Sequence, residues 1–141
     1  MNHDVLSGLP DPAAPLTCTG HGSLAERFTQ HANVRPEALC LAGSDHHWTY
    51  REVEVVTRSL AQAIARRTAG PGQVVAVYGD RSPALALALL ASIRAGCAFF
   101  IIDPKYPRER TLACTRYVRA AGILNTAKED PAADELRAAL G

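Results

Sequence analysis

The sequence has no hydrophobic stretch long enough to cross a lipid bilayer. Its longest apolar run, residues 84–93, stops before Arg94 and is shorter than the roughly 20 residues that a transmembrane helix needs. The N-terminus has no basic segment in front of an apolar one, and Asp4 lies near its start, so no secretory signal peptide is predicted. These absences favour a cytoplasmic protein with no membrane partner.

A surplus of charge of either sign is also missing. The chain has 15 Lys and Arg residues against 14 Asp and Glu residues, which gives a formal net charge of +1. Proteins that bind nucleic acid usually have a clear basic surplus, so we predict no nucleic-acid partner. With 141 residues, 48% of them hydrophobic, the chain is long and apolar enough for one domain with a buried core.

Cysteines are few, and none of them forms a CxxC pair. The four are Cys18, Cys40, Cys97 and Cys114, and all but Cys18 lie in apolar, periodic segments. This pattern favours reduced, buried cysteines that pack as small hydrophobic residues, with a disulfide or a metal site as the alternatives.

The residues that are present show a regular alternation of helix and strand patterns. Residues 1–22 are rich in proline, glycine and alanine and lack periodicity, so we predict a flexible tail there. Residues 23–141 show helix patterns at about 23–32, 49–69, 82–95, 107–120 and 130–140, and strand patterns at 38–42, 47–49, 74–78, 98–102 and 123–125. The predicted fold class is α/β: a short N-terminal hairpin, then a mainly parallel sheet flanked by helices, with right-handed crossovers.

Local capping signals support several of these boundaries. Ser23 with Glu26, and Thr49 with Glu52, form S/T-x-x-E capping boxes, in which each side chain accepts a hydrogen bond from a backbone N–H group of the other residue. Ser82 is the predicted N-cap of the third helix.

Burial is predicted from the apolar positions of each element. Strands 74–78 and 98–102 are apolar without alternation, so both are predicted to be covered on two faces. Gly96 and Gly122 are predicted to end the third and fourth helices. The predicted inward-facing positions are Val53, Val56, Leu60, Ala63 and Ile64 in the second helix, Leu85, Leu89 and Ile93 in the third, and Leu112, Tyr117 and Val118 in the fourth.

Two short segments match binding-site patterns but have plainer interpretations. Residues 20–25 fit the G-x-G-x-x-A pattern of dinucleotide sites, yet they follow a proline-rich tail instead of a strand, so a helix N-cap is favoured. Asp45, His46 and His47 offer metal ligands. Because neighbouring residues on an extended segment point to opposite sides, a solvated hairpin turn is favoured over a metal site.

A third segment, Asp80-Arg81-Ser82, follows a predicted strand. Open α/β sheets bind ligands at this end of their strands, and a capped helix start is the alternative interpretation. The sequence has neither G-x-S-x-G nor G-x-x-x-x-G-K-[ST]. We therefore predict no catalytic, cofactor-binding or metal-binding residue in this chain.

Two longer segments are more specific. Residues 48–53, W-T-Y-R-E-V, resemble the motif L-[TS]-Y-x-E-L. Residues 93–110, I-R-A-G-C-A-F-F-I-I-D-P-K-Y-P-R-E-R, resemble the motif L-K-A-G-x-A-Y-x-P-x-D-P-x-Y-P-x-E-R. Both are core motifs of nonribosomal peptide synthetase adenylation domains, which belong to the adenylate-forming, AMP-dependent synthetase/ligase superfamily, and the chain resembles that family. The chain departs from these patterns at Trp48 and Val53, which replace leucines, and at Ile101, which replaces a proline.

The resemblance runs from about residue 23 to residue 126 and implies a partial N-terminal adenylation (AMP-binding) subdomain over residues 23–141. The family uses ATP and Mg²⁺ to convert an amino or other carboxylic acid to an acyl-adenylate, and passes the acyl group to a carrier protein. The family's phosphate loop, substrate pocket and catalytic lysine lie downstream of the matching region. The resemblance therefore implies a fragment or truncated form that holds no cofactor and is inactive alone.

Two other functions remain open from the sequence. The first is a stand-alone interaction or docking module of a peptide synthetase system, which the start at Met1 and the closing helix permit. The second is an unrelated small nucleotide-binding enzyme. The expected partners are the remainder of a synthetase or a carrier protein.

Overall fold

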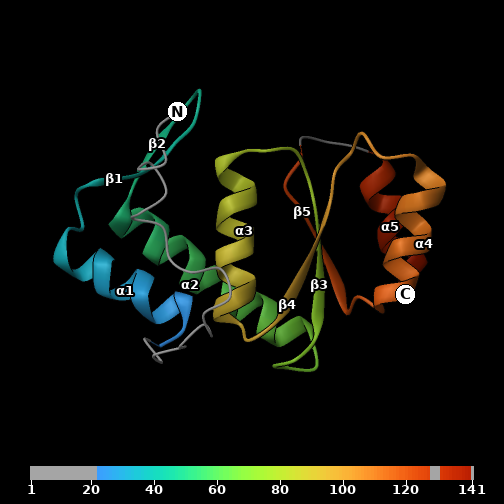
Figure 1. Cartoon of the computed structure of the whole chain (residues 1–141), viewed down its shortest axis with the longest axis horizontal. Helices are drawn as coiled ribbons and strands as arrows, with labels where there is room; N and C mark the ends of the chain where they lie inside the picture. Colours follow the sequence, from blue (N-terminus) through green and yellow to red (C-terminus); the bar gives the residue numbers. More distant parts are fainter. Residues whose placement is uncertain (1–21, 128–130, 141) are drawn as a thin grey trace, which may run out of the picture.

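The computed structural model of the chain describes residues 22–127 and 131–140 (Figure 1). The predicted tail of residues 1–22 lies outside this range except for Gly22. The elements, in chain order, are α1 (Leu24–Val34), β1 (Leu39–Ala42), β2 (His47–Thr49), α2 (Tyr50–Arg67), β3 (Val74–Tyr78), α3 (Pro83–Arg94), β4 (Ala98–Ile102), α4 (Arg108–Val118), β5 (Gly122–Asn125) and α5 (Pro131–Leu140).

The described strands form two sheets, as the sequence patterns predict. β1 and β2 pair antiparallel as a hairpin, with an irregularity in register between Leu39 and Leu41. The other three strands are parallel and lie in the order β4-β3-β5. The predicted fold class, a mainly parallel sheet flanked by helices and preceded by a hairpin, is therefore confirmed.

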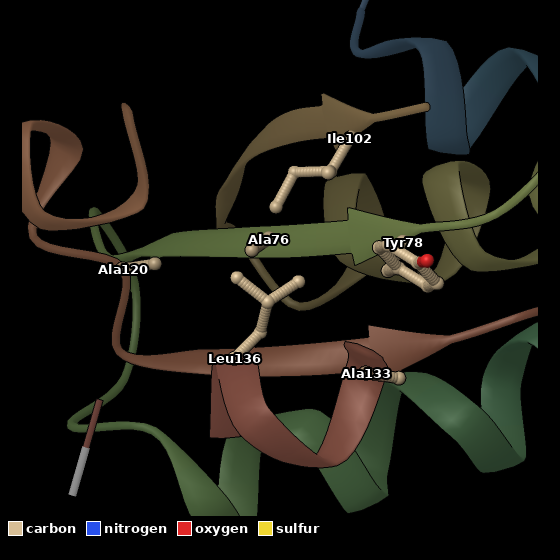
Figure 2. Packing of buried hydrophobic residues seen from close by; sticks show 6 residues of the cluster. All are labelled: Ala76, Tyr78, Ile102, Ala120, Ala133 and Leu136. Carbon is tan, nitrogen blue, oxygen red and sulfur yellow. The ribbon is translucent and has the colours of Figure 1, made fainter. Parts of the chain in front are cut away.

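Helices cover the parallel sheet on both faces, α2 and α3 on one side and α4 and α5 on the other (Figure 1). On the α4/α5 face, Tyr78 and Ile102 of the strands pack with Leu136 of α5 (Figure 2). On the α2/α3 face, Val75 packs with Ile64 of α2. β3 is the middle strand of the parallel sheet and is covered by helices on both faces, so its residues 75–78 are no more than 3% exposed.

The predicted capping boxes are present and mark where the first two long helices begin. Ser23 accepts a hydrogen bond from the backbone N–H of Glu26, and the Glu26 carboxylate accepts one from the backbone N–H of Ser23. Thr49 and Glu52 make the same reciprocal pair at the start of α2. Gly96 follows α3 with a φ of +72°, a left-handed conformation that glycine adopts without strain.

The prediction that β4 is buried on both faces is wrong. Phe99 and Ile101 are each 40% exposed, and Ile102 is the one residue of β4 that is fully buried. Among the described strands, β4 lies at the edge of the sheet and pairs with β3 alone. An apolar run without alternation is typical of central strands, and it does not distinguish them from this edge strand.

The predicted inward positions of α3 and α4 also need correction. Leu85, Leu89 and Ile93, the predicted inward positions of α3, are only half-buried. The buried residues of α3 are Leu87, Ala88, Ala91 and Ser92, because this helix contacts both α2 and the sheet and places its small residues in the tight space between them. In α4, Leu112 and Val118 are half-buried and pack against the core, as predicted. Tyr117 is instead 89% exposed, and the buried side chains are those of Thr111 and Thr115.

The end of α4 differs from its predicted position. The helix stops at Val118, and Arg119 takes a left-handed conformation with a φ of +50°. Gly122, the predicted stop, is instead the first residue of β5. In α2, Val53 and Ile64 are buried as predicted, whereas the other predicted inward positions are half-buried.

The described cysteines are free thiols that differ in burial. Cys97 is buried, as predicted, whereas Cys40 and Cys114 are half-buried. Loss of solvation raises the pKa of the Cys40 thiol. Cys18 lies outside the described residues.

A partly buried ionic cluster connects α1, α2 and α3. Arg94 of α3 pairs with Glu54 of α2 and donates a hydrogen bond of 3.2 Å from Nη1 to Thr29 Oγ1 of α1. The Arg94 guanidinium also lies 5.6 Å from the centre of the Phe28 ring, within the range of a cation–π interaction. Arg58 Nε donates a 2.6 Å hydrogen bond to Glu54, so one carboxylate serves two arginines.

Two neighbouring isoleucines test the edge position of β4. We expect Ile102→Ala to lower the free energy of unfolding by about 2–5 kcal/mol, because a fully buried side chain leaves a cavity. Ile101→Ala should cost less than about 1 kcal/mol, because that side chain is already partly in solvent. Urea unfolding followed by circular dichroism measures both changes. Equal losses for the two variants would contradict the edge position.

The ionic cluster predicts a loss of stability at acid pH. Burial raises the pKa of Glu54, but the hydrogen bond from Arg58, the charge of Arg94 and the hydrogen bond from Thr29 outweigh it and hold this pKa below its usual value. A lowered folded-state pKa contributes stability that is complete above the unfolded-state pKa of about 4.3 and is lost as pH falls through the folded-state value.

Glu54→Gln should therefore be less stable at pH 7 by about 2–3 kcal/mol, with the difference from wild type shrinking below pH 4. Urea unfolding between pH 3 and pH 7 measures it. A constant difference across that range would show that the Glu54 carboxylate is not the titrating group.

Candidate functional site

The carboxyl ends of the three parallel strands meet at one edge of the sheet, and a crevice of about 630 Å³ lies there. Asp80 follows β3, Pro104 follows β4 and Thr126 follows β5. Open α/β sheets place ligands in this position. We call this site the carboxyl-edge crevice. Its lining is Gly43, Ser44, Asp45, His46, Trp48, Asp80, Ser82, Pro83, Ala84, Pro104, Thr126 and Ala127.

The hairpin turn between β1 and β2 forms one wall of the crevice. It reaches the start of α3 closely: a Cβ atom added to Gly43 would lie 2.9 Å from Cγ of Pro83 and 3.1 Å from the His46 carbonyl oxygen. A side chain at residue 43 would push the turn away from α3. Glycine at this position therefore keeps the hairpin against the parallel sheet.

A second close approach joins the ends of β3 and β5. The backbone N–H of Thr126 donates to the Tyr78 carbonyl oxygen at 2.8 Å, and the Thr126 hydroxyl donates to the same oxygen at 3.2 Å. A Cβ atom added to Gly79 would overlap Thr126 Oγ1. The absence of a side chain at Gly79 is what lets the two strand ends close this part of the crevice.

The helix start and the loop after β4 are fixed by backbone hydrogen bonds. Ser82 accepts a 3.2 Å hydrogen bond from the backbone N–H of Leu85, so it is the N-cap of α3. In the D-P-K-Y-P segment, the Asp103 carboxylate accepts a 2.9 Å hydrogen bond from the backbone N–H of Lys105. The Tyr106 N–H donates to the Asp103 carbonyl oxygen at 3.0 Å. This motif therefore shapes a loop, and Arg110 lies over the exposed Tyr106 ring at 5.2 Å.

Histidine and acidic side chains meet at the hairpin side of the crevice. The His46 ring packs edge-on against Trp48, with ring centres 4.7 Å apart, and its Nε2 lies 3.9 Å from Glu52 Oε1. Hydrogen bonds from the backbone N–H and hydroxyl of Thr49 lower the pKa of Glu52 below its usual value, and His46 adds to this effect. Among the described residues, no group of three or more His, Cys, Asp or Glu gathers closely enough to hold a metal ion.

The charge of the crevice does not fit a nucleoside triphosphate. Two carboxylates, Asp45 and Asp80, are part of its lining, and none of the described residues that line it is an arginine or lysine. Arg81 is exposed and is not one of the lining residues. Phosphate groups are normally bound by cationic side chains and by unpaired backbone N–H groups, so we assign no nucleotide-binding role to these side chains.

Two of the three short candidate segments come together in this crevice. Asp45 and His46 from the hairpin turn line it together with Asp80 and Ser82, although they are far apart in sequence. The third segment, residues 20–25, lies partly outside the described residues, and within the described part Ser23 is a helix N-cap. That this chain has no catalytic, cofactor-binding or metal-binding residue remains a prediction.

Thr126 is a lining residue that motif reasoning does not single out, whereas Pro104 belongs to the quoted motif of residues 93–110. The sequence signal for Thr126 is its position directly after β5, which becomes informative only once the strand order is known. Gly79 lies directly after β3. A side chain at this position would overlap Thr126.

The model of the AMP-binding enzyme family matches residues 28–141. This chain belongs to the AMP-binding enzyme family. The match covers most of the chain and includes both sequence segments that resemble adenylation-domain motifs. The predicted recognition, the N-terminal part of a peptide synthetase adenylation domain, is confirmed by the relatives and structures below.

The curated relatives of this AMP-binding family chain are much longer than it is. It is 33% identical over 143 residues to the L-2-aminoadipate reductase large subunit of Penicillium chrysogenum, a match that covers 96% of this chain and 10% of the relative. It is 32% identical to a dimodular nonribosomal peptide synthase of Bacillus subtilis, over 77% of this chain and 4% of the relative. The chain therefore spans a tenth or less of the length of these relatives.

This family member also matches only part of each similar solved structure. The nonribosomal peptide synthetase protein PA1221, which contains adenylation and PCP domains, matches 78% of this chain with a TM-score of 0.73 and 24% identity, over 22% of its own chain. The synthetase FmoA3, bound to α-methyl-L-serine-AMP, matches 74% with a TM-score of 0.71 and 26% identity, over 12% of its chain. Even the isolated N-terminal subdomain of Klebsiella oxytoca NpsA is matched over only 34% of its length, with a TM-score of 0.66.

In the described part of this family member, no helix combines the length and apolar character that a membrane crossing requires.

The contact between Gly79 and Thr126 can be tested by a double-mutant cycle. Gly79→Ala should lower the free energy of unfolding by about 1–3 kcal/mol, because the new methyl group overpacks the strand ends. Adding Thr126→Ala should restore part of this loss, since the nearest remaining atoms lie at 3.2 Å and 3.3 Å.

The matched control is Gly122→Ala, where the added Cβ meets no atom within 4 Å and the expected change is within about 0.5 kcal/mol. Urea unfolding of the four proteins of the cycle and of the control gives the coupling energy. Strictly additive effects of Gly79→Ala and Thr126→Ala would contradict the close approach.

Proposed function

We propose that residues 23–141 are part of the N-terminal subdomain of a nonribosomal peptide synthetase adenylation domain, preceded by a flexible tail at residues 1–22. The complete enzyme would activate an amino acid or another carboxylic acid with ATP and Mg²⁺ as an acyl-adenylate, and then load the acyl group onto a carrier protein. The partners of this chain are then the remainder of the synthetase and the carrier protein, and its place is the cytoplasm.

We also propose that the chain is catalytically silent by itself. The observation that carries this proposal is the match to about a third of an isolated adenylation N-terminal subdomain and to about a fifth of PA1221. Acyl transfer to a phosphate needs preorganised cationic and backbone groups around the phosphorus. The sequence has no G-x-x-x-x-G-K-[ST] segment, and the crevice at the strand ends has carboxylates, Asp45 and Asp80, in its lining.

A second candidate function is a docking module of a peptide synthetase system. It is supported by the edge strand β4, whose Phe99 and Ile101 are each 40% exposed, since an open apolar edge is suited to pairing with another polypeptide. Co-purification of the chain with a specific synthetase or carrier protein from the producing cell would favour this function. Failure to bind either at micromolar concentration would exclude it.

Catalytic silence is tested by ATP–pyrophosphate exchange. The purified 141-residue protein, with ATP, Mg²⁺ and a panel of amino acids and aromatic acids, should give no exchange above the protein-free control. Purified PA1221 serves as the positive control. Exchange that depends on one of the acids and is absent from a mock purification would contradict the proposal.

A further inference from the structure

The solvent-facing side of α4 has basic and aromatic side chains. Thr111 and Thr115 are the buried residues of this helix, so the opposite side of α4 faces solvent. Residues three, four or seven positions apart lie in one row along a helix, and Arg110, Ala113 and Tyr117 form such a row, in which each residue is exposed. We call this row and its two flanking cations the α4 face; its residues are Arg110, Ala113, Arg116, Tyr117 and Arg119.

The positive charges of the α4 face are not matched by nearby carboxylates. Arg110, Arg116 and Arg119 are exposed, and none of the ion pairs among the described residues includes them. Glu109 is the acidic residue of α4, and it lies in the first turn, where the helix dipole favours a carboxylate. The α4 face therefore has a local excess of positive charge in a chain whose net charge is +1.

Arg119 occupies a backbone position that suits glycine. Its φ of +50° is left-handed, and it is the only non-glycine residue with a positive φ in the part of the chain that the structure describes. A side chain costs energy in this conformation, and glycine is the usual residue at such a helix end. Arg116 already places a cation in the last turn of α4, where it interacts with the helix dipole. A contact of Arg119 with a partner explains why an arginine occupies this strained position.

Tyr117 is the second unusual residue of the α4 face. It is 89% exposed, more than any other large hydrophobic side chain among the described residues. Tyrosine and arginine are the residue types that contribute most binding energy in protein interfaces. Ala113, one turn earlier, has only a methyl group, so a partner can approach the helix backbone closely beside the Tyr117 ring.

We propose that the α4 face binds an acidic helix of a separate protein partner. Carboxylates of this helix pair with Arg116 and Arg119, and an apolar side chain packs over Ala113 against the Tyr117 ring. The row from Arg110 to Tyr117 is about 10 Å long, or two helical turns. Such a row packs against the side chains of a second helix as ridges into grooves.

Charge and patterning favour an acidic protein over a nucleic acid or a membrane surface. Proteins that bind nucleic acid usually have a clear basic surplus, whereas this chain has a net charge of +1. A helix that lies on a membrane buries a continuous apolar face in the lipid. The apolar residues of α4, Leu112 and Val118, pack instead against the core of this chain.

The test is an NMR titration of the full 141-residue chain with two synthetic peptides. The first is a helical peptide of about 15 residues with a row of leucines flanked by glutamates, and the second has a lysine in place of each glutamate. We expect the acidic peptide to bind with a Kd of about 100 μM or tighter and to shift the amide signals of residues 110–119. The lysine peptide should bind at least about 10-fold more weakly, because its charges repel the arginines.

Charge reversal makes the test specific. The double variant Arg116→Glu with Arg119→Glu should bind the acidic peptide at least about 10-fold more weakly and bind the lysine peptide more tightly than wild type does. Tyr117→Ala should weaken acidic-peptide binding about 5-fold or more. The matched control is Arg66→Glu with Arg67→Glu, which reverses two charges in the last turn of α2, on the other side of the sheet (Figure 1). The control should bind both peptides as wild type does.

Arg119→Gly separates binding from folding. Because glycine adopts the left-handed conformation without strain, we expect this variant to unfold at the same urea concentration as wild type or at a higher one, while it binds the acidic peptide more weakly. Unfolding at a lower urea concentration together with unchanged binding would show that Arg119 serves the fold alone, and would contradict its role in the α4 face.

Urea unfolding curves verify that each variant is folded before its binding is compared. Four results would overturn the proposal. They are no binding of the acidic peptide at about 1 mM, shifts confined to residues outside α4, unchanged binding of the acidic peptide by the folded charge-reversal variant, and tighter binding of another ligand through the same arginines. The other ligands in this comparison are a single-stranded oligonucleotide and phosphatidylserine vesicles.

Discussion

The central strand β3 has to be hydrogen-bonded along both edges and covered on both faces, and the other elements are arranged to meet this requirement. Its residues 75–78 are at most 3% exposed. β4 and β5 pair with it in parallel, and parallel neighbours need crossover helices, which lie on the two faces. The two cores on either side of β3, one with α2 and α3 and one with α4 and α5, follow from this single constraint.

The same parallel arrangement creates the crevice at the carboxyl edge. The loops after all three strands emerge there, and the hairpin turn closes one side because glycine at position 43 lets it approach Pro83. The side chains that the fold brings to this edge include two carboxylates and a histidine. The carboxylates make the crevice a poor binding site for phosphate groups. The adenylation-domain motif in the D-P-K-Y-P segment acts here as a loop-forming element through hydrogen bonds of Asp103.

Both neighbours of β3 are exposed at a sheet edge. Among the described strands, β4 and β5 are the edge strands of the parallel sheet. Half-buried Leu60 and Leu124 and the open space at Gly122 lie beside β5. In the comparisons, similar proteins contain the matched region as a small part of a longer chain.

Local sequence determined the helix starts, the alternation of elements and the family. The capping boxes at Ser23 and Thr49 and the N-cap at Ser82 involve neighbouring residues only, so pattern alone is sufficient to place them. The two adenylation-domain motifs are also runs of consecutive residues, so the sequence alone was sufficient to indicate the family.

Tertiary structure alone decided which strand is central and which side chains meet. β3 and β4 have similar apolar sequences, yet one is buried and the other is an edge strand, because burial depends on neighbours that are distant in the chain. Asp45 and Asp80 share a crevice, and Gly79 must be a glycine, for the same physical reason: these contacts join separate elements. Their distances are set by packing and not by spacing along the sequence.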